Sequence, residues 1–372
     1  MKLAVDATSL LLPRTGIGVF TSEMLRALAG RPDMQVSAFN TSPRGRGRGW
    51  LPSEIGDGVH EVPGRMPTGG VRWLWDSLSV PRLEWLAGSA DVAHGPNYRV
   101  PPTTRAAPVV SVHDISFEHG PPISSPAGRA HRRSVRAAVR AGAWIHTDSE
   151  YVAAEVREIY PIEPHRVVTV PLGVRLPPAG PHPAPGAPYV LALGATDRRK
   201  GLTTLVAAFD ALAFTDRDLR LVHAGPDGDA SDDLSDAINR SPHRDRILRL
   251  GWVDDGARTA LIEEAAAVAY PSRYEGFGLV VLEAMAAGRP VVTTQSAAIP
   301  EVAGDAAVYV EAGDADALAG GLHRVLTDQE LSAELSARGR GRSAVFTWER
   351  TADGLIDLYT EASAARRSAL SM

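Results

Sequence analysis

The chain has 372 residues, more than a single hydrophobic core usually supports, so we expect two domains. Its 39 Lys and Arg against 44 Asp and Glu give a net charge of −5, which gives no reason to expect nucleic acid as a partner. The absence of cysteine excludes disulfides, thiolate chemistry and cysteine-based metal sites.

The first residues predict a strand, a glycine loop and a helix. Residues 2–5 form an apolar strand, the next segment contains Gly16 and Gly18, and a helix is expected from about Val19 to Ala29. Such a loop lets the backbone approach a ligand closely, although an ordinary tight turn has the same pattern. Because no run of about 18 apolar residues and no signal-peptide pattern occurs, we expect a cytoplasmic protein.

An arginine and glycine segment follows the second expected strand, Gln35–Asn40. It carries Arg44, Arg46 and Arg48 without any hydrophobic period, which indicates a surface loop. The loop is either solvated or a clamp for an anionic acceptor or an anionic membrane surface. In the second case the nearby tryptophans would assist it by lying at the interface. They are Trp73, Trp75 and Trp85.

Two further apolar strands end at polar residues. One ends at His94, and another, Val109–Val112, leads directly into His113 and Asp114. Open α/β sheets bind ligands at the carboxyl ends of their strands, so His113 lies where chemistry is expected. The alternative is a strand-end histidine that caps local backbone.

The rest of the first half alternates helices and strands up to a segment rich in proline. Helices are expected over Arg129–Gly142 and Glu150–Tyr160, and strands over Trp144–Thr147 and Val167–Pro171. Residues 172–188 contain many prolines and glycines, which are typical of a linker. The alternation of strands and helices predicts parallel sheets.

A second α/β series begins with the apolar strand Tyr189–Leu193. Gly194 follows the strand, and Arg198, Arg199 and Lys200 precede the next helix. Cations at this position could bind an anionic group such as a phosphate, whereas the alternative is a plain basic loop at a helix start. Lys200 is one of only two lysines in a chain that otherwise uses arginine, which indicates a local need for a compact ammonium. Further along, a helix is expected over Leu261–Val268.

The stretch from Ala269 to Val292 carries the strongest pattern in the chain. Glu275 and Glu283 stand in an E-x7-E spacing, with Gly276 and Gly278 between them. A helix beginning near Gly278 would direct its free N–H groups at an anion. With a rise of about 1.5 Å per residue, Glu283 lies more than one turn inside that helix, so the two carboxylates can hold two ends of one ligand. A solvated helix is the alternative, but the apolar neighbours of Glu283 favour burial.

This stretch resembles the signature of retaining glycosyltransferases of family 4, the mannosyltransferase-like group 1 enzymes, which have the GT-B fold. The resemblance implies an α/β protein of two Rossmann-like parallel-sheet domains that face a cleft. The first domain would span residues 1–171, the linker 172–188 and the nucleotide-sugar domain 189–347. The C-terminal helix, 348–372, would cross back to the first domain.

The resemblance also implies a reaction. A hexose moves with retention from a nucleoside diphosphate sugar, GDP-mannose before UDP-sugars, to a hydroxyl of a glycan, lipid-linked or small-molecule acceptor. Neither a cofactor nor a metal is expected, and the acidic pairs Asp227 with Asp229 and Asp314 with Asp316 are interpreted as solvated turns. A sugar-nucleotide epimerase and a non-catalytic sugar-nucleotide-binding regulator are the alternatives.

Site residues follow from matching positions. His113, Arg199, Lys200 and Glu275 would be catalytic, with His113 on the transferred sugar, and Asp114 would lie beside the acceptor. The donor-binding set would be Gly16, Gly18, Gly194, Arg198, Arg199, Lys200, Val253, Glu275, Gly276, Phe277, Gly278, Leu279 and Glu283. Within it, Glu275 would position the sugar hydroxyls and Glu283 the ribose. Members of the family often have an arginine directly after the glycine, where this chain has Ala195, so the later cations must bind the phosphates.

Overall fold

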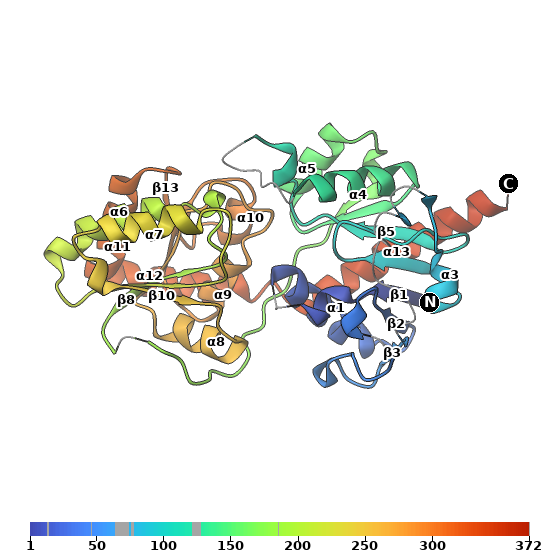
Figure 1. Cartoon of the computed structure of the whole chain (residues 1–372), viewed down its shortest axis with the longest axis horizontal. Coiled ribbons are helices and arrows are strands. Elements are labelled where there is room, and N and C mark those ends of the chain that lie inside the picture. The colour runs from blue at the N-terminus through green and yellow to red at the C-terminus, as the bar shows by residue number, and fades with distance from the viewer. Residues whose placement is uncertain are drawn as a thin grey trace. The chain divides into compact units, whose positions relative to one another are not determined.

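The computed structural model describes residues 1–12, 15–45, 47–63, 74–75, 78–120, 128–184 and 186–371. The chain divides into two compact units (Figure 1). The first comprises Met1–Glu118, Pro126–Gly173 and Trp348–Met372, and the second His119–Ser125 and Val174–Thr347. The boundary at Gly173 falls within the expected linker, and the C-terminal helix belongs to the first unit.

The first unit contains a seven-stranded sheet in the order β3-β2-β1-β4-β5-β6-β7, with every pair parallel. Its strands are β1 Lys2–Asp6, β2 Gln35–Phe39, β3 Val59–Glu61, β4 Val92–Gly95, β5 Ala107–Ser111, β6 Trp144–Thr147 and β7 Val167–Thr169. Its α-helices are α1 Gly16–Ala29, α3 Leu83–Ala87, α4 Gly128–Arg140, α5 Glu150–Ile159 and α13 Trp348–Leu370. Short 3-10 turns occupy Thr8–Leu11, Pro43–Gly45, Ser53–Ile55, Ser116–Glu118 and Pro164–Arg166. The central strands β4, β5 and β6 are buried at every residue, as a parallel sheet covered on both faces requires.

Helix α1 begins earlier than expected. Gly16 and Gly18 lie in its first turn and not in a loop, so the helix starts three residues before Val19, the expected start. Phe20, Met24 and Leu28 are fully buried at helical spacing. Packing of this apolar face decides where the helix runs, and it outweighs the low helix propensity of the glycines.

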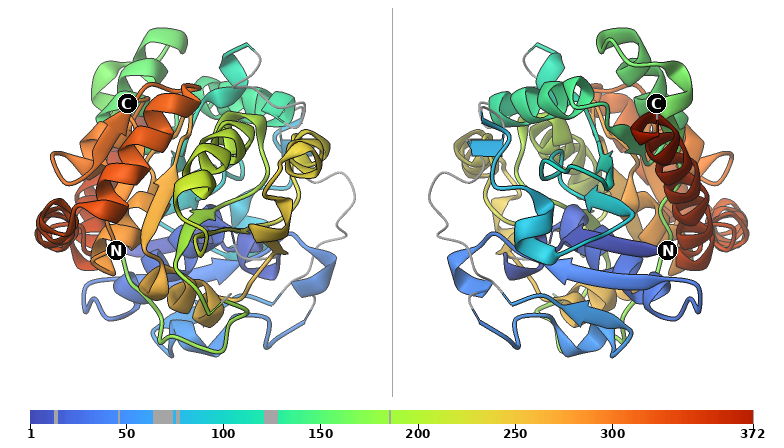
Figure 2. Two further views of the ribbon diagram at one scale, coloured as in Figure 1. Left: turned by 90° about the vertical axis from the view of Figure 1, so that its left-hand side faces the viewer. Right: turned by 90° about the vertical axis from the view of Figure 1, so that its right-hand side faces the viewer.

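Helix α13 packs onto the first unit through its buried face, which includes Leu355 and Tyr359. It contacts α1 and β5, and Figure 2 shows it beside the strands of the first sheet. The hydroxyl of Thr351 donates a hydrogen bond of 2.8 Å to the carbonyl oxygen of Pro171. These contacts place the C-terminal helix against the N-terminal sheet, as the resemblance implied.

The second unit has a six-stranded parallel sheet in the order β10-β9-β8-β11-β12-β13. The strands are β8 Tyr189–Leu193, β9 Arg220–Ala224, β10 Ile247–Gly251, β11 Ala267–Tyr270, β12 Val291–Thr294 and β13 Val308–Val310. The α-helices are α6 Leu202–Thr215, α7 Ser231–Arg240, α8 Asp255–Glu264, α9 Leu279–Ala286, α10 Ile299–Ala303, α11 Ala315–Thr327 and α12 Gln329–Ser343. Short 3-10 turns lie at Arg198–Lys200 and Arg244–Arg246.

The helix expected over Leu261–Val268 is wrong at both ends. Helix α8 ends at Glu264, and residues from Ala267 to Tyr270 form β11, a strand at the centre of the sheet. All four strand residues are buried. A short apolar run of this kind has no period that separates a buried strand from a buried helix, which explains the error.

Candidate active site

The loop after β8 brings two cations to the carboxyl edge of the second sheet. Gly194 follows the strand with a φ of 125°, and the 3-10 turn Arg198–Lys200 leads into α6. A Cβ atom on Gly201 would lie 2.4 Å from the carbonyl oxygen of Pro271, so only glycine lets the loop approach the end of β11 this closely. The close approach carries the side chain of Lys200 toward the residues that follow β11.

Glu275 lies in the loop between β11 and α9, where Lys200 and Arg199 both reach it. Its Oε1 atom is 2.7 Å from Nζ of Lys200 and 3.0 Å from an Nη atom of Arg199. The hydroxyl of Ser272 donates to the same oxygen, and Nζ of Lys200 also donates to the hydroxyl of Tyr270 at 2.7 Å. Glu275 is only 6% exposed, so it lies inside this cluster rather than at an open mouth of the loop.

Charge and burial act in opposite directions in this cluster. Burial alone would raise the pKa of Glu275, but the charges of Arg199 and Lys200 and the hydrogen bonds lower it to about 2. Burial lowers the pKa of Lys200, and the nearby Arg199 adds to this effect, while Glu275 partly offsets it. The ion-paired groups are two cations and one carboxylate, which leaves one surplus positive charge among them, with Asp197 as a further acidic residue that acts on Lys200. The cluster can therefore accept an anionic group.

Helix α9 begins beside the cluster. Gly278 is its N-cap with a φ of 101°, a conformation that residues with a side chain rarely adopt, and Leu279 is the first helical residue. The N–H groups of the first turn and the helix dipole favour negative charge at this end. Phe277, 6% exposed, packs its ring edge-on against Phe346 with 5.9 Å between centroids. The glycine and helix start expected from the sequence are therefore present.

Glu283 lies inside α9 and is 8% exposed, as its apolar neighbours predicted. Its carboxylate forms an ion pair with Arg258 of α8. Burial lowers the pKa of Arg258, but the charge and hydrogen bond of Glu283 raise it more. Sequence reasoning missed Arg258. A buried carboxylate does require a partner, but the sequence does not indicate which arginine supplies it.

Two other residues that were predicted to bind the donor lie outside this cluster. Arg198 is half-exposed and pairs with Asp233 at 2.6 Å, so it does not join Arg199 and Lys200. Val253 follows β10, next to Trp252, whose exposed fraction is 53%.

The first unit places His113 and Asp114 directly after β5. Nδ1 of His113 lies 2.7 Å from Oδ2 of Asp148, and Nε2 lies 2.8 Å from the carbonyl oxygen of Pro96. Both partners are distant in sequence, so His113 does not cap local backbone, and its contact with the transferred sugar stays a prediction. Asp114 accepts hydrogen bonds from the backbone N–H and the hydroxyl of Ser116. Asp148 was not singled out in the sequence.

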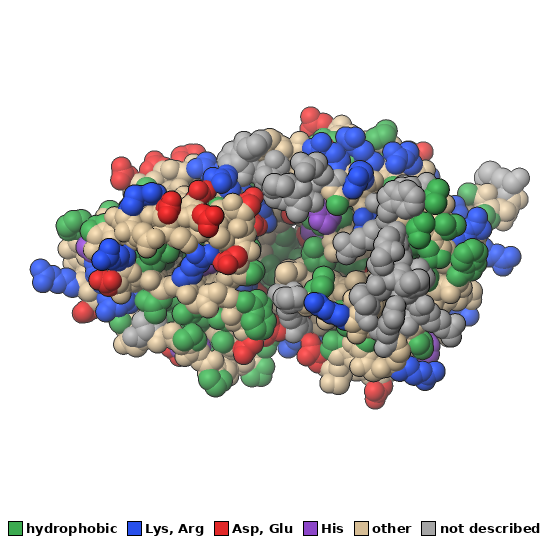
Figure 3. Space-filling view, in the orientation of Figure 1, with side chains coloured by type: hydrophobic (Ala, Val, Ile, Leu, Met, Phe, Trp, Pro, Cys, Tyr) green, Lys and Arg blue, Asp and Glu red, His purple; other side chains and the backbone are tan. Residues whose placement is uncertain are grey.

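Basic and aromatic surface residues of the first unit differ from expectation. Arg44 and Arg48 are exposed, whereas Arg46 and Trp73 lie outside the described residues. Trp75 is buried and donates to the carbonyl oxygen of Pro81 at 3.0 Å, so it cannot serve a surface, while Trp85 is 68% exposed. Exposed arginines also occur on α4, at the part of the unit where Figure 3 shows Lys and Arg side chains gathered.

The structure was searched for metal-binding groups and for helices that could span a membrane. Within the described residues no group of three or more acidic or histidine side chains could hold a metal ion. Asp227 instead pairs with Arg249 at 2.6 Å, and Asp314 caps α11 by accepting from the N–H of Ala317. The same part of the chain contains no helix that is both long and apolar enough to cross a membrane.

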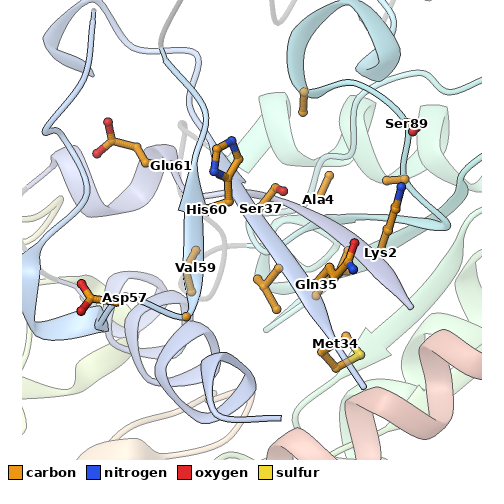
Figure 4. A pocket seen from close by; sticks show the side chains of 15 residues that line it. Lys2, Ala4, Met34, Gln35, Ser37, Asp57, Val59, His60, Glu61 and Ser89 are labelled. Atoms are coloured by element: carbon orange, nitrogen blue, oxygen red, sulfur yellow. The ribbon is translucent and has the colours of Figure 1, made fainter. Parts of the chain in front are cut away.

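A cavity of about 610 Å³ opens at the other edge of the first sheet (Figure 4). Its lining includes Lys2, Gln35 and His60, which belong to β1, β2 and β3. These are the amino-terminal parts of the parallel strands β1 and β2. Because sheets of this kind bind ligands at the carboxyl ends of their strands, the cavity is not the candidate site.

Solved structures with the same architecture define the fold class. Sucrose-phosphate synthase from Thermosynechococcus elongatus has a TM-score of 0.72 at 19% identity, covering 98% of this chain and 99% of that chain. WaaG, a glycosyltransferase involved in lipopolysaccharide biosynthesis, has a TM-score of 0.71 at 17% identity, covering 97% and 100%. The protein thus has the two-domain GT-B fold of glycosyltransferases.

Sequence comparison identifies the family. Residues 15–173 match the glycosyl transferase 4-like domain, and residues 180–342 match glycosyl transferases group 1. O-antigen chain mannosyltransferase B of Escherichia coli is 30% identical over 283 residues, which are 72% of this chain and 74% of that protein. D-inositol 3-phosphate glycosyltransferase of Saccharomonospora viridis is 33% identical over 243 residues, 60% and 56% of the two chains. The chain belongs to the group 1 glycosyltransferases.

Proposed function

We propose that this glycosyltransferase moves a hexose, with mannose as the first candidate, from a nucleoside diphosphate sugar to an acceptor hydroxyl with retention of configuration. The observation that carries the proposal is the buried cluster of Glu275, Arg199 and Lys200 beside the start of α9. Its surplus positive charge and the helix N-terminus suit a diphosphate. Relatives named as mannosyltransferases support the choice of sugar, and a structural neighbour, Anabaena HepE, was solved with UDP and glucose.

The chemistry assigns a role to each charge. In the transition state positive charge develops on the sugar while the departing diphosphate gains negative charge. Arg199 and Lys200 stabilise the leaving group, and Glu275 orients the sugar hydroxyls. Glu283, held by Arg258, binds the ribose. A departing phosphate oxygen takes the proton of the acceptor hydroxyl, so a separate general base is not needed.

A panel of donors tests the proposed substrate class. GDP-mannose, UDP-glucose and UDP-galactose are added to the protein, thermal unfolding is followed, and free mannose serves as the control. A donor present at 100 times its Kd stabilises the folded state by about 2.7 kcal/mol. We expect the largest shift with GDP-mannose and none with free mannose. If no sugar nucleotide shifts the unfolding midpoint, the donor class is wrong.

Product analysis separates the proposal from its alternatives. An epimerase would convert the donor sugar without an acceptor and release no nucleoside diphosphate. A binding protein would show the thermal shift without any product. Release of nucleoside diphosphate that depends on an added acceptor supports only the transferase.

Metal independence is a further expected result. If Arg199 and Lys200 neutralise the diphosphate, transfer should continue at an unchanged rate in excess EDTA. Protein treated with EDTA and then supplied with Mg²⁺ or Mn²⁺ is the matched control. A rate that disappears with EDTA and returns with either ion would assign the neutralisation to a metal.

A further inference from the structure

Three histidines lie side by side in the interior of the first unit: His94 in β4, His113 just after β5 and His146 in β6. His94 and His146 are fully buried, and the side chain of His113 is 12% exposed. Phe20 of α1 packs against all three rings, with centroid distances of 6.3, 5.0 and 5.3 Å in that order. Buried ring nitrogens need hydrogen-bond partners, so the partners determine the protonation of each ring.

His94 and His146 belong to one ordered chain of hydrogen bonds. Nε2 of His146 must donate, because its partner at 3.0 Å is the carbonyl oxygen of Val170. Nδ1 of a neutral His146 then accepts from the hydroxyl of Ser111 at 2.9 Å, and that hydroxyl accepts from Nε2 of His94 at 2.8 Å. Nδ1 of His94 finally accepts from the hydroxyl of Tyr359 at 2.7 Å. Every bond is satisfied with both rings neutral, and burial lowers the pKa of both.

His113 differs because both of its partners are acceptors. A carboxylate oxygen of Asp148 faces Nδ1, and the carbonyl oxygen of Pro96 faces Nε2. A neutral ring would place a lone pair against one of these oxygens, so both nitrogens must carry protons. Burial lowers the pKa of His113, but the charge and hydrogen bond of Asp148 and the bond to Pro96 raise it more. Asp148 itself is only 2% exposed.

The two partners of His113 follow β4 and β6, the strands on either side of β5. His113 therefore ties together three loops at the carboxyl edge of the sheet. The loop after β4 is tightly constrained, since Tyr98 has a φ of 57°, and its hydroxyl accepts from the backbone N–H of Asp114 at 3.3 Å. Asp114 is the residue expected beside the acceptor.

We propose that Asp148 is a positioning residue, which keeps His113 as an imidazolium and thereby fixes the loops after β4, β5 and β6 around Asp114. Its effect on catalysis rests on the proposed transfer reaction, whereas its effect on the charge of His113 does not. The other titratable groups around His113 are Asp114 beside it, Tyr98 of the loop after β4, His94 of β4 and His146 of β6. Of these, only Asp114 adds to the stabilisation of the cation, so Asp148 is the principal counter-charge.

Nitrogen NMR of the histidine rings measures the charge directly. In protein labelled with ¹⁵N-histidine at pH 7, we expect both ring nitrogens of His113 to be protonated, with the signal assigned by its loss in His113→Gln. Asp148→Asn keeps the size of the side chain and removes its charge, so His113 should become neutral at the same pH. Tyr359→Phe is the matched control: it removes one bond of the neutral chain, and His113 should stay charged. A neutral His113 in the unaltered protein would overturn the proposal without any use of a variant.

Kinetics supply the second readout. The pKa of His113 is raised above its usual 6.5 in the folded protein, so the cross-link is complete at lower pH and is lost as pH rises through the folded value. In the unaltered protein, kcat/KM for the acceptor should fall as pH rises through the pKa of His113, which gives the basic limb of the pH profile. In Asp148→Asn this basic limb should lie at lower pH, so kcat/KM at pH 7.5 should be about tenfold lower than in the unaltered protein. Donor Kd should not change. An unshifted limb would contradict the positioning role, whereas absence of transfer in the unaltered protein would contradict the proposed function and leave the NMR result standing.

Discussion

Replacing Lys200 with alanine should lower kcat/KM for transfer by about 10² to 10³, because the change removes a charge aimed at the leaving diphosphate. The ammonium lies between Glu275 and the hydroxyl of Tyr270, 2.7 Å from each. Without it, Glu275 keeps its ion pair with Arg199 at 3.0 Å. The cluster then contains one cation and one carboxylate, and its surplus positive charge disappears. Steady-state kinetics with donor and acceptor varied in turn measure the loss.

Two companion variants separate charge from packing. Lys200→Met retains an unbranched stem without the ammonium and should lose activity to a similar extent, while the unfolding midpoint reports whether the fold is intact. Lys200→Arg should also lose activity, although less, because a planar guanidinium is larger than the ammonium that this space holds. Lys2→Ala changes the other lysine of the chain, which lies at the amino-terminal end of β1 in the first unit. This variant should have unchanged kcat/KM. Normal turnover in Lys200→Met would mean that the charge has no role.

The local parts of the site were predictable from sequence. The glycine before α9, the buried position of Glu283 and the two cations before α6 each follow from a short stretch of residues, and the structure places them as expected. The predictions for the start of α1 and for the strand β11 were wrong, because a short stretch of residues does not determine these two features. In both cases packing against residues distant in sequence, rather than local propensity, decides where the element begins.

Partnerships across the sheets were not predictable. Glu275 meets Lys200 because β8 and β11 are neighbours, although 75 residues separate the two side chains. His113 lies beside Asp148 because β5 and β6 are neighbours, and Glu283 pairs with Arg258 because helices α8 and α9 pack against each other. The sequence contains many arginines and acidic residues that would be equally suitable partners. The order of the strands and the packing of the helices select among them.

Variants of Glu275 and Glu283 should differ in their affinity for a nucleoside diphosphate that carries no sugar. Glu275→Gln preserves shape but loses the charge-assisted hydrogen bond to the sugar, so kcat should fall by about 10². Its nucleoside diphosphate affinity should stay close to normal, because Arg199 and Lys200 remain. Since the pKa of Glu275 is lowered from 4.5 to about 2, the carboxylate is charged throughout the neutral range, and its stabilising contribution is lost only as pH falls toward 2. Ionisation of Glu275 itself should therefore add no pH dependence to the effect of this substitution between pH 6 and 9.

Glu283→Gln should show the reverse behaviour, because its proposed partners are the ribose hydroxyls, which the reaction does not change. We expect calorimetry with GDP and UDP to show affinity about tenfold weaker, equivalent to about 1.4 kcal/mol. The substitution also leaves Arg258 buried without its counter-charge, so the unfolding midpoint without ligand must be recorded to separate lost folding from lost binding. Arg258→Lys keeps the charge beside Glu283 but not the guanidinium geometry, and it should weaken binding less than Glu283→Gln does. If Glu275→Gln and Glu283→Gln lose the nucleoside diphosphate equally, the division of roles between the two carboxylates is wrong, and both would act on the same part of the donor.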